Sequence, residues 1–70
     1  MQTTLSLYQQ SIQKIVPDLD PAHVEAYMRM EYGTLDGISP AQFKACAKRA
    51  ASDVRLDPEF AAEVAASYGF

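Results

Sequence analysis

The sequence predicts an all-α fold, a compact bundle of four short helices that forms a single domain over residues 1–70. Three observations support this prediction. A helix-start signal is repeated along the chain, apolar residues recur at helical spacing, and no segment alternates between apolar and polar residues as a half-buried strand would. Because the chain has only 70 residues, it has room for one hydrophobic core.

The helix-start signal is an apolar residue followed by Asp or Ser and then by Pro, at residues 19–21, 38–40 and 56–58. Asp and Ser are favoured N-caps because their side-chain oxygens accept hydrogen bonds from the free N–H groups of the first turn. Proline suits the first helical position, where an N–H would have no helical partner. In the second copy, Gln42 follows Ser39 at the spacing of a capping box. We therefore expect three helices to begin at these prolines, Pro21, Pro40 and Pro58.

The four helices are expected at about residues 5–16, 21–32, 40–54 and 58–68. The first has the weakest start signal, for which Thr4 is the candidate cap, and it ends before Pro17 because a proline disfavours helical geometry in the preceding residue. The second is expected to end at Gly33, with Leu35 as the apolar residue of a Schellman-type close. Gly69 is expected to close the fourth.

The composition argues against several classes of protein. Cys46 is the only cysteine and His23 the only histidine, so the sequence predicts no disulfide within the chain and no metal site. No segment has the run of about 18 apolar residues that a membrane span needs. The N-terminal residues lack the pattern of a signal peptide, and a lone thiol suits a reducing compartment, so we expect a cytoplasmic protein.

The sequence also predicts that the protein is not an enzyme. A cysteine nucleophile needs a partly exposed site that stabilises the thiolate, whereas Cys46 falls on the predicted apolar stripe with Phe43 and Ala50. The lone His23 is better explained as a partly exposed residue at a helix start than as a catalytic base. There is no glycine-rich phosphate loop and no metal-ligand spacing. We therefore predict no catalytic residue, no cofactor and no small-molecule substrate.

Protein–protein contact is the leading functional hypothesis. The helix expected over residues 21–32 is apolar around most of its circumference, and Glu25 and Arg29 form its one clear polar edge. Such a helix is either central in its domain or covered by a second surface. Tyr27 and Met30 are the interface candidates, because aromatic and Met side chains are enriched in interfaces. The hypothesis is a non-enzymatic interaction or regulatory module that presents a helical surface to a protein partner or to a second copy.

Nucleic-acid binding is the alternative hypothesis. Residues 39–55 contain four basic residues and one acidic residue, a charge of +3, whereas the rest of the chain has a charge of −6. The four basic residues are expected on the exposed side of the third helix, where they can face phosphates: Lys44, Lys48, Arg49 and Arg55. The connection of about seven residues before this helix is longer than the tight turn of a helix-turn-helix motif, which weakens the alternative.

The motifs do not place the chain in a known family. A small compact domain without catalytic groups is typical of accessory proteins of bacteria or mobile elements. This is an analogy at the level of size and composition, and it predicts no particular activity.

Overall fold

The computed structural model describes residues 5–70 and contains four helices, α1 (Leu7–Ile15), α2 (Pro21–Tyr32), α3 (Pro40–Leu56) and α4 (Pro58–Ser67). The described residues contain no strand, and none of their helices has both the length and the apolar character needed to cross a membrane. The predicted all-α bundle of four short helices is therefore confirmed. The bounds of α2 match the prediction. α3 and α4 differ from it by two and one residues at their C-terminal ends, and α1 is shorter than predicted at both ends.

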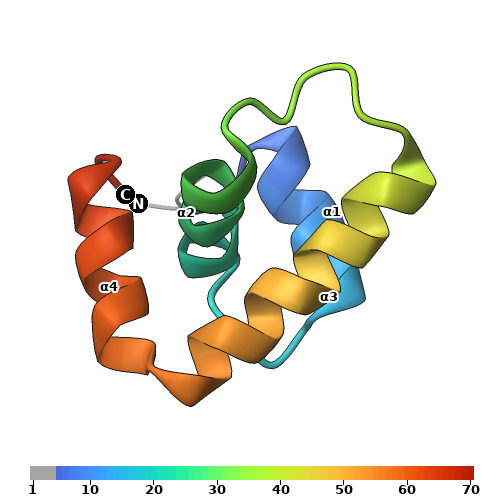
Figure 1. Cartoon of the computed structure of the whole chain (residues 1–70). Coiled ribbons are helices and arrows are strands. Elements are labelled where there is room, and N and C mark those ends of the chain that lie inside the picture. Colours follow the sequence, from blue (N-terminus) through green and yellow to red (C-terminus); the bar gives the residue numbers. More distant parts are fainter. Residues whose placement is uncertain (1–4) are drawn as a thin grey trace.

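The four helices are arranged around α2, which packs against each of the other three (Figure 1). α4 lies on one side of α2 and α1 on the other, and α1 and α4 do not touch. α3 runs across the bundle and contacts all three of its neighbours. The second helix is therefore the central helix of the domain, which is one of the two interpretations of its apolar character given above.

The three predicted helix starts are confirmed by their caps. An Asp20 carboxylate oxygen accepts from the N–H of Ala22 at 2.9 Å, and Asp57 accepts from the N–H of Phe60 at 3.1 Å. At α3, the Ser39 hydroxyl accepts from the Gln42 N–H at 3.2 Å, while the Gln42 side chain accepts from the Ser39 N–H at 3.4 Å. This reciprocal pair is the predicted capping box.

The start of α1 differs from the expectation. The N-cap is Ser6, whose hydroxyl accepts from the Gln9 N–H at 3.1 Å, and the Gln9 side chain accepts from the Ser6 N–H at 3.4 Å. The helix therefore begins at Leu7 instead of at residue 5, because this capping box is the same Ser-x-x-Gln arrangement that starts α3. Thr4, the expected cap, lies outside the described residues.

The helix ends show one correction. Gly33 ends α2 with φ 78° and ψ −114°, which is far from the left-handed helical conformation of a Schellman close. The chain instead turns away, and Leu35 is buried in the core. The Schellman motif is found at the end of α4, where Gly69 has φ 84° and its N–H donates to the Ala66 carbonyl at 3.0 Å. The N–H of the next residue donates to the Ala65 carbonyl at 2.9 Å.

The main core lies between α1, α2 and α3, and the connection between α2 and α3 and the first turn of α4 each add a residue to it. Its members are apolar and buried: Ile12, Val24, Met28, Leu35, Phe43, Ala47, Ala50, Val54 and Ala61. Leu19 and Ile38, the apolar residues before the caps of α2 and α3, pack against this core. Leu56, in the same place before α4, is 84% exposed because the residue that it would meet at the fourth position of α4 is the small Ala61.

Candidate protein-binding surface

A buried polar network joins α1 to α2. The Glu25 side chain is 3% exposed, and its carboxylate accepts three hydrogen bonds. The Gln9 amide donates one at 2.9 Å, and the Arg29 guanidinium donates two, at 3.0 and 2.9 Å. The predicted polar edge of α2 is thus a Glu25–Arg29 pair, and its carboxylate is buried. α1 covers this edge of the helix, and Gln9 supplies the partner that the carboxylate needs away from water.

The network continues to the loop after α2 through Tyr8. The Arg29 guanidinium lies 5.6 Å from the centre of the Tyr8 ring, and this ring stacks on Phe43 with the ring centres 5.9 Å apart. The Tyr8 hydroxyl donates a hydrogen bond to the Asp36 carboxylate, which raises the pKa of Tyr8 above its ordinary value. These groups bind one another, and within residues 5–70 every buried side-chain nitrogen or oxygen has a partner. The network therefore joins α1, α2 and the loop after α2.

The structure does not bring Cys46 and His23 together. Cys46 is half-buried beside Tyr32, at the end of α2, and both residues line a hollow of about 360 Å³. His23 lies in the first turn of α2, nine residues and roughly 13 Å along the helix axis from Tyr32. Its Nε2 atom is 3.7 Å from a carboxylate oxygen of Asp20, the cap of the same helix. Within the described chain, no three His, Cys, Asp or Glu side chains gather as they would around a metal ion.

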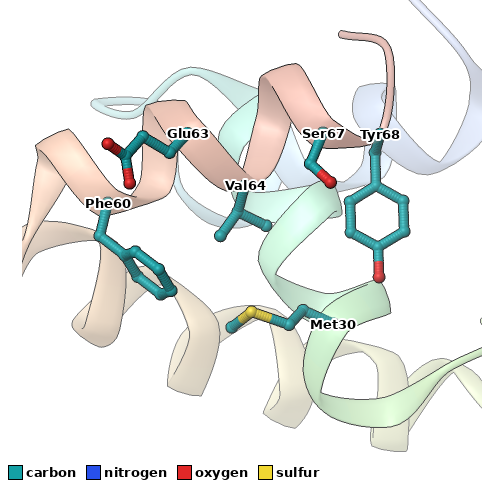
Figure 2. Close-up of a pocket in the computed structure, with 6 residues that line it drawn as sticks. All are labelled: Met30, Phe60, Glu63, Val64, Ser67 and Tyr68. Carbon is teal, nitrogen blue, oxygen red and sulfur yellow. The ribbon is translucent and has the colours of Figure 1, made fainter.

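An exposed apolar surface, which we call the α2–α4 patch, is formed by Met30 of α2 with Phe60, Val64 and Tyr68 of the α4 segment. Met30, Phe60 and Tyr68 are 41, 40 and 46% exposed. They surround a hollow of about 310 Å³ that is also lined by Glu63 and Ser67. Figure 2 shows the Met30 side chain opposite Val64, with Phe60 at one end of the hollow and Tyr68 at the other.

The two predicted interface residues lie differently with respect to this patch. Met30 belongs to it. Tyr27 is half-buried, and its ring packs edge-to-face against Phe60 with the ring centres 6.1 Å apart. Burial, followed by the charge of nearby Asp53, raises the pKa of Tyr27. Tyr27 therefore supports the patch from one side through Phe60.

Phe60 and Tyr68 belong to the α2–α4 patch, but the sequence did not predict that they would be exposed. Their spacing puts both on one helical stripe with Ala61 and Val64. α4 packs mainly on α2, which buries Ala61, Val64 and Ala65 and leaves the two large aromatic rings at the edges of the contact. The spacing correctly predicts that these residues share one face of the helix. It does not predict how much of that face the neighbouring helix α2 buries.

The four basic residues predicted for nucleic-acid contact are all exposed on α3, and two of them have carboxylate neighbours. The Arg55 guanidinium donates to both carboxylate oxygens of Asp18, at 3.0 and 3.2 Å, and these bonds hold the pKa of Asp18 below its ordinary value. The pKa of Glu31 is raised by burial and by neighbouring Asp53, and the positive charge of Arg49 acts in the opposite direction. Lys44 and Lys48 form no ion pair with any residue of the described chain.

Another apolar hollow, of about 470 Å³, lies between α1, the end of the connection before α3 and the first turn of α3, and we call it the α1–α3 groove. Two lysines line it, Lys14 of α1 and Lys44 of α3. The other lining residues are mostly apolar: Leu7, Tyr8, Ser11, Ile15, Leu35, Ile38, Pro40 and Phe43. Leu7 is 80% exposed, so the groove continues into an apolar side chain that extends into solvent.

Neither protein-family models, nor characterised proteins, nor solved structures matched this chain.

Proposed function

We propose that the protein is a non-enzymatic interaction or regulatory module that binds another protein through the α2–α4 patch. This proposal rests on one observation. Met30, Phe60 and Tyr68, each at least 40% exposed, cluster around a single hollow. Apolar side chains scattered singly over a surface are ordinary, whereas a contiguous apolar patch marks a binding site. Met and aromatic residues are also the side chains that interface centres favour.

The edge of the patch indicates which kind of partner fits it. Glu63 and Ser67 line the hollow beside the apolar groups, and α4 contains no basic residue. A partner with an apolar side chain for the hollow and a basic group near Glu63 satisfies both features. The partner is either another protein or a second copy of this chain.

We propose a cytoplasmic location, in keeping with the single unpaired cysteine, and a role as an accessory protein in bacteria or mobile elements.

Affinity capture from host cells tests this function with three baits: the parent protein, Met30→Ser and Leu56→Ser. Met30 belongs to the patch, whereas Leu56 is an equally apolar, 84% exposed residue that does not line the hollow. We expect a protein that the parent and Leu56→Ser retain and that Met30→Ser loses. If the three baits retain the same proteins in the same amounts, the patch is not the binding surface.

Nucleic-acid binding through α3 is the second candidate. It is favoured by Lys44 and Lys48, which are exposed one helical turn apart and have no ion-pair partner in residues 5–70. It ranks below protein binding because Arg55 is paired with Asp18 and Arg49 lies close to Glu31. Binding to generic DNA and RNA at two salt concentrations tests it, since phosphate contacts weaken steeply as salt rises. An absence of binding at low salt would rule this candidate out.

A further inference from the structure

We propose that the α2–α4 patch of one copy docks into the α1–α3 groove of a second copy, so that the protein self-associates head to tail. This inference rests on the proposed function and names the partner of the same patch. The two surfaces are complementary in both polarity and charge, as the residues that line them show.

The groove is an apolar surface with a positive edge. Leu7, Ile38 and Phe43 are among its apolar residues, and Lys14 and Lys44 are its charged ones. No carboxylate lines it, and neither lysine forms an ion pair within the described chain. An occupant that brings both an apolar side chain and a carboxylate would bury the first and pair the second with a lysine.

The patch offers this combination. Phe60 and Met30 provide apolar side chains that are about 40% exposed, and Glu63 lines the same hollow one helical turn from Phe60. Glu59 is also exposed and lies one turn before Glu63 on α4. That helix has no basic residue to neutralise these two carboxylates. The patch therefore has an acidic edge where the groove has a basic one.

Charge favours head-to-tail docking over the pairing of identical surfaces. Two patches face to face would bring the Glu63 carboxylates of both copies together, and two grooves would bring four lysines together. Like charges placed opposite one another disfavour association. In Figure 1, α1 and α4 lie on opposite sides of α2, so the groove and the patch of one copy are both free to bind neighbours. Such an interface grows into chains or closes into rings.

Light scattering over a concentration series tests this arrangement. We expect the average mass to rise past that of a dimer as the concentration increases. It should fall when salt is raised from about 50 to about 500 mM, because the screening length shortens roughly threefold over this range. Lys44→Glu and Glu63→Lys should each weaken self-association by about tenfold, because each places like charges opposite one another. Lys48→Glu, on the same helix but outside the groove, is the matched control and should leave the mass unchanged.

Mixing the two charge reversals is the decisive step. In a head-to-tail interface, the reversed patch of Glu63→Lys fits the reversed groove of Lys44→Glu, while the unchanged surfaces fit each other. An equimolar mixture should therefore recover the parent mass that neither variant reaches alone. A parent protein that stays monomeric at about millimolar concentration overturns the self-docking, as does a mixture that does not recover. Either result leaves the capture experiment with Met30→Ser as the independent test of the proposed function.

Discussion

The carboxylate of Glu25 is held inside the molecule by hydrogen bonds from Gln9 and Arg29. A charge taken out of water is costly unless it is paired and its other lone pairs are used, and both conditions are met here. The Gln9 amide does more than one task, because its oxygen accepts from the Ser6 N–H while its nitrogen donates to Glu25. The start of α1 and the packing of α1 on α2 therefore depend on the same side chain.

Replacing Arg29 tests the role of this network in stability. Arg29→Met keeps an unbranched side chain near Tyr8 but leaves the buried carboxylate with Gln9 as its only side-chain partner. Breaking a buried pair costs about 3–5 kcal/mol, and we expect about 2–3 kcal/mol here because Arg29 itself is 31% exposed. Urea unfolding measures the loss. Arg29→Lys keeps the charge but not the paired donors, so it should lie between Arg29→Met and the parent; identical midpoints for all three would contradict this role.

This network shows where sequence reasoning stops at the scale of single residues. The spacing of Glu25 and Arg29 predicts that they pair along one face of a helix, and they do. The same spacing is compatible with a solvated face or a covered one, because it carries no information about the neighbouring helix. Gln9 lies sixteen residues earlier in the chain, and its role depends on the angle at which α1 crosses α2.

At the scale of the elements, the four helices begin at side-chain caps formed by residues close in sequence. Ser6, Asp20, Ser39 and Asp57 each accept a hydrogen bond from an N–H two or three residues ahead. Because the interaction is local, the sequence predicts it well, and three of the four starts were predicted at the correct residue. The start of α1 was predicted two residues too early, although Ser6 and Gln9 have the spacing of a capping box.

Ser39→Ala tests the cap of α3. The substitution removes the acceptor for the Gln42 N–H and should cost about 1 kcal/mol in the free energy of unfolding. Ser52→Ala is the control, because this exposed serine lies inside the same helix and its hydroxyl donates back to the Lys48 carbonyl at 3.3 Å. Such a bond does not help the helix, so alanine there should be neutral or slightly stabilising. Thermal melts in which both variants behave alike would show that the cap has no special role.

At the scale of the whole molecule, the bundle was predictable and its surface was not. The apolar stripes and caps predict four packed helices, and the structure confirms them. Exposure depends on how much of each stripe a neighbour covers. α2 is apolar nearly all round because it is central, yet Met30 reaches the surface beside Phe60 and Tyr68, at the edge of the contact with α4.

Phe43→Ala tests whether one small core stabilises the entire domain. Phe43 is 9% exposed and packs in the main core while stacking on Tyr8. Its truncation should cost about 3–5 kcal/mol. A domain of 70 residues has a total stability of roughly 4–10 kcal/mol, so the melting temperature should fall sharply or the cooperative transition should disappear. Leu56→Ala, at an 84% exposed position, should melt close to the parent. A Phe43→Ala melt equal to that of the parent would mean that the core lies elsewhere.

The most direct test of the central claim, that this protein acts by binding through the α2–α4 patch, is photo-crosslinking in the host. A benzophenone-bearing phenylalanine analogue is placed at position 68, in the patch, and separately at position 56, an exposed control site outside it. We expect a covalent adduct of defined mass from position 68, to another protein or to a second copy, and no such adduct from position 56. An absence of adducts at position 68, or the same adducts from both positions, would contradict it.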